Sequence, residues 1–80
     1  MVMYRDFAVR MARARNLLGY VQNLSDGTVR VVVEGERPAL DTFVKKLRTG
    51  PMLAQVQRLD IITLPATEEF DSFVILRDSA

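Results

Sequence analysis

Apolar residues recur at spacings of three and four near the start of the chain, at Tyr4, Phe7, Met11 and Ala14. This spacing places them on one side of a helix, so the pattern predicts an amphipathic helix over residues 4–15. Asn16 follows, and Asn tolerates the left-handed conformation that ends many helices. We therefore expect the first helix to stop at this residue.

A second apolar stripe with helical spacing lies in the middle of the chain, at Leu40, Phe43, Val44 and Leu47. Pro38 suits the first position of a helix, and Gly50 followed by Pro51 suits its end. The pattern predicts a helix over residues 38–49. Its N-cap is weak, because neither Glu36 nor Arg37 is a preferred capping residue.

The remaining apolar segments favour strands. Residues 18–24 and 28–34 flank Ser25-Asp26-Gly27, whose turn chemistry predicts a hairpin. In its second strand Val29, Val31 and Val33 share one face, as in a sheet that is covered on one side. We predict two further strands, over residues 56–64 and 72–77. The acidic stretch between them, with Glu68 and Glu69, reads as a solvated loop.

The predicted order is helix, strand, strand, helix, strand, strand. This is an α+β, ferredoxin-like βαββαβ arrangement that lacks its first strand and adds a strand at the end. With 80 residues, the chain has room for one domain, residues 1–80. In this topology the first strand lies in the middle of the sheet, so we expect its absence to leave a gap there.

Composition limits which catalytic and metal-binding groups the chain can contain. The chain has no Cys and no His, which excludes thiolate or imidazole metal sites, Cys nucleophiles and catalytic triads with a His base. Eleven basic and ten acidic residues give a net charge of +1, which indicates neither a nucleic-acid partner nor a membrane partner. No apolar run approaches the ~20 residues of a membrane helix. We expect a cytoplasmic protein, because the lack of Cys fits a reducing compartment.

One stretch carries a family resemblance. Residues 19–29, Gly-Tyr-Val-Gln-Asn-Leu-Ser-Asp-Gly-Thr-Val, with Gly35 beyond them, resemble the acylphosphatase signature around that family's essential Asn. A second family signature contains a glycine-rich phosphate loop that ends in an aromatic residue and Arg. It survives here as Val2-Met3-Tyr4-Arg5. The resemblance covers nearly the whole chain.

The resemblance implies an acylphosphatase-type sandwich, with two helices on one face of a mixed sheet. It also implies an enzyme that hydrolyses acyl phosphates, small molecules, to carboxylate and phosphate without metal or cofactor. In that family Arg binds the phosphate and Asn positions water, roles that fall on Arg5 and Asn23. The backbone amides of Met3, Tyr4 and Arg5 are what remains of the phosphate loop. The chemistry is coherent, because phosphoryl transfer needs neutralised charge and a placed nucleophile more than a covalent catalyst.

Simpler interpretations exist for the same residues. Without the resemblance, Arg5 is one of four arginines on a helix and would most often be a solvated surface charge. Asn23 precedes a turn and, from spacing alone, is better explained as a residue that stabilises this turn through local hydrogen bonds.

The missing strand has three explanations: a reading frame that truly starts upstream of Met1, which we favour, a strand recruited by exchange between two copies, or a relic without phosphate binding. We expect a monomer when the strand is present and a strand-exchanged dimer otherwise. The 80-residue chain should have low activity, because loop amides are lost.

The main alternative function is a catalytically impaired binding or regulatory domain, as in hydrogenase-maturation carbamoyltransferases. An RNA-binding ferredoxin-like domain is weaker, because residues 28–34 contain no aromatic residue.

Overall fold

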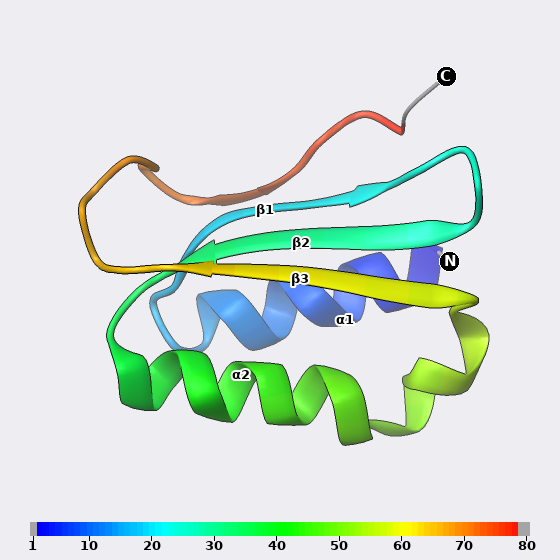
Figure 1. Ribbon diagram of the computed structural model, residues 1–80, viewed down its shortest axis with the longest axis horizontal. Helices are drawn as coiled ribbons and strands as arrows, with labels where there is room; N and C mark the ends of the chain where they lie inside the picture. Colours follow the sequence, from blue (N-terminus) through cyan, green and yellow to red (C-terminus); the bar gives the residue numbers. More distant parts are fainter. Residues whose placement is uncertain (1, 79–80) are drawn as a thin grey trace.

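The computed structural model describes residues 2–78. Met1, at which we expect a misplaced start, and residues 79–80 lie outside this range. The elements in order are α1 (Val2–Arg13), β1 (Leu18–Asn23), β2 (Thr28–Glu34), α2 (Arg37–Thr49), the 3-10 helix η1 (Pro51–Gln55), β3 (Arg58–Leu64) and β4 (Phe73–Ile75). Figure 1 shows their arrangement.

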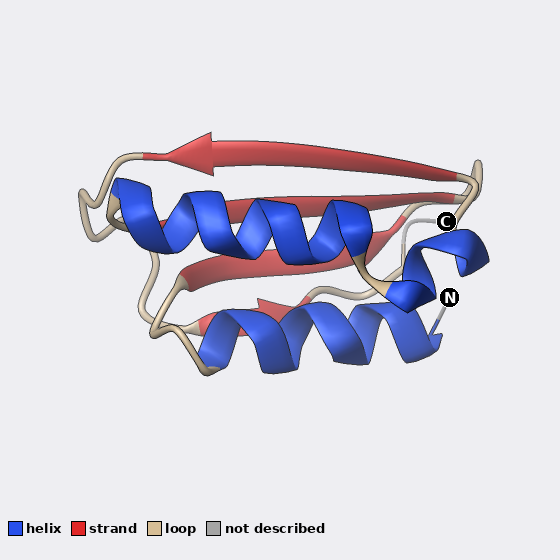
Figure 2. Cartoon of the chain, turned by 90° about the horizontal axis from the view of Figure 1, so that it is seen from below, coloured by secondary structure: helices blue, strands red, loops and turns tan. Residues whose placement is uncertain are grey.

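The four strands form one mixed sheet in the order β3-β2-β1-β4. Strands β1 and β2 are antiparallel, whereas β1 pairs with β4 in parallel and β2 pairs with β3 in parallel. Figure 2 views the molecule from the side of α1 and α2, which lie together on one face of the sheet. This confirms the predicted α+β, ferredoxin-like architecture.

The expectation of a gap inside the sheet is wrong for the described residues. Strand β3 pairs directly with β2 along its full length, from Arg58 opposite Thr28 to Leu64 opposite Glu34. In the expected arrangement the first strand would lie between β2 and β3 and run antiparallel to both, so β2 and β3 would run parallel to each other. Without a strand between them, β2 and β3 can pair directly as parallel strands, with α2 as the crossover that such a pair requires.

The core lies between the helices and the sheet. Alternate residues of β2 point toward the helices, and Val29, Val31 and Val33 are fully buried there. The other core residues come from both helices, β1, β4 and the loop after α1, and they are Tyr4, Ala8, Val9, Ala12, Leu17, Val21, Leu40, Phe43, Leu47 and Phe73. Both predicted helical stripes therefore face the sheet.

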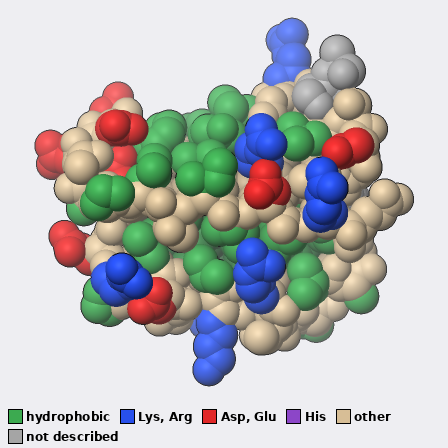
Figure 3. All heavy atoms as spheres, viewed as in Figure 1, with side chains coloured by type: hydrophobic (Ala, Val, Ile, Leu, Met, Phe, Trp, Pro, Cys, Tyr) green, Lys and Arg blue, Asp and Glu red, His purple; other side chains and the backbone are tan. Residues whose placement is uncertain are grey.

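The opposite face of the sheet is only partly open. Figure 3 shows hydrophobic side chains gathered on the side from which Figure 1 views the strands. Ile62 and Val74 remain 44% and 38% exposed there, since they alternate with core-facing neighbours. At the end of β2, however, Glu34 is 1% exposed. This face is thus covered at one end, which the alternation of the sequence did not predict.

A loop covers Glu34 through its backbone. The carboxylate of Glu34 accepts hydrogen bonds from the backbone N–H groups of Glu68, Glu69 and Phe70, at 2.7, 2.9 and 3.2 Å. Glu68 has a left-handed φ of 59°, which helps successive N–H groups point to one anion. The side chains of Glu68 and Glu69 are exposed, as predicted, but their backbone groups bind a buried carboxylate.

Element boundaries differ from prediction by a few residues. Helix α1 ends at Arg13, and Asn16 has the expected left-handed φ of 56°. Helix α2 begins one residue early, and its N-cap Glu36 makes no side-chain capping bond, as predicted. Strand β3 begins at Arg58 rather than residue 56, because η1 ends at Gln55 and Val56 is its C-cap residue.

Candidate active site

Arg5 lies in the first turn of α1, as the motif implied. Its side chain is only 19% exposed, and its Nη1 donates a 2.8 Å hydrogen bond to Oδ1 of Asp78. Its Nε is buried and has no hydrogen-bond partner. The first turn contains no acidic side chain, so the cation adds to the positive end of the helix dipole. This part of the molecule is therefore suited to an anion.

Asn23 is the last residue of β1 and is 7% exposed. Its backbone pairs with Val29, whereas its side-chain Oδ1 is buried without a hydrogen-bond partner. The turn that follows is closed instead by backbone bonds between Leu24 and Thr28 and between Gly27 and Leu24. The side-chain oxygen of Asn23 is thus not used by the turn.

The fold brings Arg5 and Asn23 to the same end of the molecule. Helix α1 and strand β1 are joined by a short connection and run in opposite directions, so the start of one lies beside the end of the other (Figure 1). The chain after β4 connects the two regions. Gln22, the neighbour of Asn23, donates its side-chain N–H to the carbonyl of Arg77, and the next residue, Asp78, contacts Arg5.

The backbone groups of Met3, Tyr4 and Arg5 all belong to the first turn of α1. The first four N–H groups of a helix have no acceptor within the helix, so this turn presents donors to a ligand or to water. Their role in binding phosphate remains a prediction.

Tyr4 fixes the position of this turn. Its side chain is fully buried, and its hydroxyl donates a 2.8 Å hydrogen bond to the backbone carbonyl of Leu47 in α2. Burial raises the pKa of Tyr4 to about 12, with Arg48 acting in the opposite direction. Helical spacing indicates that Tyr4 is an apolar position but does not indicate this bond, because its acceptor lies 43 residues along the chain.

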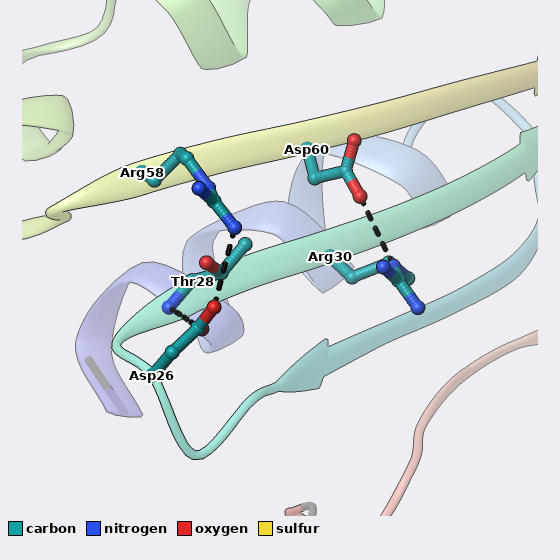
Figure 4. Close-up of polar contacts among 5 residues, drawn as sticks. All are labelled: Asp26, Thr28, Arg30, Arg58 and Asp60. Carbon is teal, nitrogen blue, oxygen red and sulfur yellow. Dashed lines mark hydrogen bonds and ion pairs between the residues drawn. The ribbon is translucent and has the colours of Figure 1, made fainter.

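Asp26 holds the turn after Asn23 (Figure 4). Its Oδ1 accepts the backbone N–H of Thr28 at 2.9 Å, and its Oδ2 accepts Nη2 of Arg58 at 3.2 Å. The hydrogen bonds with Thr28 are the main cause that lowers the pKa of Asp26. Figure 4 also shows the Arg30–Asp60 ion pair across β2 and β3, at 3.1 Å. These contacts fasten the hairpin that carries Asn23 to β3.

The aromatic residue on β1 does not form an open stacking platform. Tyr20 contacts Phe70 edge to face, with ring centroids 6.1 Å apart and planes inclined by 64°. Base-stacking sheets instead expose flat aromatic faces on neighbouring strands. This arrangement gives no support to the RNA-binding alternative.

Two further findings concern metal ions and membranes. Residues 2–78 hold no group of three or more His, Cys, Asp or Glu side chains that could bind a metal ion. No helix in this part of the chain combines the length and the apolar character needed to cross a membrane.

Comparison with known proteins gives one consistent result. A family model described as acylphosphatase matches residues 1–75. The acylphosphatase of Methylococcus capsulatus is 43% identical over 77 residues, covering 96% of this chain and 84% of that protein. The acylphosphatase of Deinococcus radiodurans is 49% identical over 57 residues, covering 71% of this chain and 66% of that protein.

A larger protein also contains a similar segment. The probable carbamoyltransferase HypF of Methanocaldococcus jannaschii is 35% identical over 75 residues, which cover 92% of this chain but 10% of that protein. No solved structure matches the chain at a significant level. Since the family model spans most of the chain and relatives of similar length share this much sequence, the chain belongs to the acylphosphatase family.

Proposed function

We propose that this chain hydrolyses acyl phosphates to a carboxylate and inorganic phosphate, with Arg5 binding the phosphate and Asn23 positioning the attacking water. One observation supports the assignment of these roles to Arg5 and Asn23. Nε of Arg5 and Oδ1 of Asn23 are the buried side-chain atoms of residues 2–78 that lack a hydrogen-bond partner. Buried polar groups are normally paired, so an unpaired donor and an unpaired acceptor at one end of the molecule favour a ligand-binding role for these two residues.

The two atoms suit the two tasks. The guanidinium of Arg5 keeps its charge at any physiological pH and can direct several donors at phosphate oxygens. The Nε donor requires an acceptor, which a phosphate oxygen provides. The α1 dipole and the amides of its first turn add to the attraction. Arg5 therefore neutralises charge on the phosphate group as the reaction proceeds.

Oδ1 of Asn23 can accept a hydrogen bond from water and turn a lone pair of the water oxygen toward phosphorus. That oxygen bonds to phosphorus, the bond from phosphorus to the bridging oxygen breaks, and the carboxylate leaves with the electron pair. The proton released by water passes to a phosphate oxygen, so Asn23 contributes orientation rather than basicity. A carboxylate leaving group is good enough for this to suffice.

The test measures phosphate release from benzoyl phosphate with a chelator present, together with binding of inorganic phosphate. We expect Arg5→Ala and Asn23→Ala each to lower kcat/KM by about 10² to 10³. Arg10→Ala is the matched control, because Arg10 is an exposed arginine of the same helix. The assignment fails if both site variants stay within about twofold of the parent protein.

A binding or regulatory domain is the second candidate, and the similarity to a short segment of the HypF protein favours it. This function predicts a folded protein that binds inorganic phosphate through Arg5 but releases none from benzoyl phosphate. Measuring binding and turnover on the same samples separates the two functions.

We also propose a cytoplasmic location, which rests on the absence of Cys. Strand exchange between two copies remains a prediction. Light scattering of the purified chain over a range of concentrations would detect the dimer, and a monomer at all concentrations would exclude it.

A further inference from the structure

The chain after β4 follows the end of β1 toward the proposed site. The backbone N–H of Leu76 donates to the carbonyl of Val21 at 2.9 Å, and the carbonyl of Arg77 accepts the side-chain N–H of Gln22 at 2.9 Å. Asp78 then contacts Arg5 at 2.8 Å. The match to the family model ends at residue 75, so Asp78 lies beyond it.

The contact places an anion on the proposed phosphate-binding group. A carboxylate and a phosphate are both oxyanions that accept hydrogen bonds from a guanidinium. While Asp78 accepts the Nη1–H of Arg5, this donor is engaged, and the negative charge of Asp78 opposes the approach of another anion. Phosphate must therefore displace Asp78 or share Arg5 with it.

The exposed fractions of the two side chains indicate which of them can leave the ion pair. The side chain of Asp78 is 57% exposed, whereas that of Arg5 is 19% exposed. The carboxylate can return to water at little cost, because exposed ion pairs are weak. The guanidinium has less freedom, because its Nε is buried in the protein. A competing anion would thus displace Asp78 and leave Arg5 in place.

We propose that Asp78 is an intramolecular competitor for Arg5, which weakens the binding of phosphate and so speeds release of the phosphate product. The proposal rests on the proposed function, in which Arg5 binds phosphate. It adds a residue that the family resemblance did not indicate. It also gives the segment 76–78 a role, because this segment carries the carboxylate to Arg5.

The experiment titrates the full chain with inorganic phosphate at low ionic strength and follows amide shifts by NMR. We expect Asp78→Asn to lower the Kd for phosphate by about two- to fivefold. The difference from the parent protein should shrink as sodium chloride is added, because salt screens the competing charge. Asp60→Asn is the matched control, since Asp60 forms an ion pair with Arg30 and its side chain is 43% exposed. It should change the Kd by less than twofold.

An unchanged or higher Kd for Asp78→Asn would overturn the proposal, because Asp78 would then be inert or would hold Arg5 in position. An equal decrease in Asp60→Asn would overturn it too, since net charge alone would explain the effect. Arg5→Ala distinguishes a failure of the proposed function from a failure of the role proposed for Asp78. If it binds phosphate like the parent protein, the proposed function itself is wrong. If it loses binding while Asp78→Asn changes nothing, only the role of Asp78 is wrong.

Discussion

The hydroxyl of Tyr4 donates a hydrogen bond to the backbone carbonyl of Leu47, joining the first turn of α1 to the last turn of α2. Carbonyl groups in the last turn of a helix have no partner within the helix, so this bond satisfies one of them inside the core. Arg5 is the next residue of α1. The position of the proposed phosphate-binding residue therefore depends on packing between the two helices.

Tyr4→Phe should lower the free energy of unfolding by about 1–2 kcal/mol, because it removes the donor and leaves the buried carbonyl of Leu47 without this partner. Urea denaturation measures the change. Tyr20→Phe is the control, since Tyr20 is half-buried and its ring contact with Phe70 persists in the variant. Equal losses in the two variants would contradict a specific role for the Tyr4 hydroxyl.

Alkaline pH should destabilise the protein through the same residue. Burial raises the pKa of Tyr4 from 10.0 to about 12, so the unfolded chain loses this proton first. Its contribution to stability is complete below pH 10 and is lost as the pH rises through the folded-state value, by about 2–3 kcal/mol in all. The advantage in stability of the parent protein over Tyr4→Phe should therefore disappear over this interval. Parallel stability curves from pH 9 to 12 would show that Tyr4 does not titrate as proposed.

Glu34→Gln should release the loop that covers the end of β2. The amide presents one acceptor oxygen, and its NH₂ group faces backbone donors, so bonds to a charged acceptor are lost at a cost of about 2–3 kcal/mol. Amides 68–70 should exchange with solvent faster in a hydrogen-exchange experiment. Glu36→Gln provides the control, because Glu36 is exposed and makes no side-chain capping bond. Unchanged protection of amides 68–70 in Glu34→Gln would refute the anchoring role.

Gly19→Ala should destabilise the sheet by about 2–3 kcal/mol. Gly19 has a φ of 132°, and a Cβ there would collide with the carbonyl oxygen of Val32 in the neighbouring strand. Gly27→Ala should cost less, about 1 kcal/mol, because its Cβ would meet the flexible end of the Gln57 side chain. Thermal unfolding of both variants would rank them, and the reverse order would contradict the steric argument.

The sequence alone determined the local elements. The strand Thr28–Glu34 has its predicted bounds, and Asn16 ends the first helical segment in the predicted conformation. These features follow from hydrophobic period and turn chemistry, which depend on residues a few positions apart. The 3-10 helix Pro51–Gln55 escaped prediction, because so short a segment has no periodicity of its own.

For the site, the motif named Arg5 and Asn23, and the opposite directions of α1 and β1 in the structure bring them to one end of the molecule. What the motif could not indicate is that each carries a buried atom without a partner. That property depends on every neighbour of the atom in space. It is the observation that favours a ligand over the simpler interpretation of Asn23 as a turn residue.

Only the tertiary structure decided which segments meet. Alternation along a strand indicates which face is buried but not which strand lies beside it, so direct pairing of β2 with β3 replaced the expected gap. Glu34 reaches backbone donors 34 to 36 residues away, and Arg5 meets Asp78 across 73 residues. Such contacts depend on how the whole chain closes around its core, and no local pattern of residues encodes that.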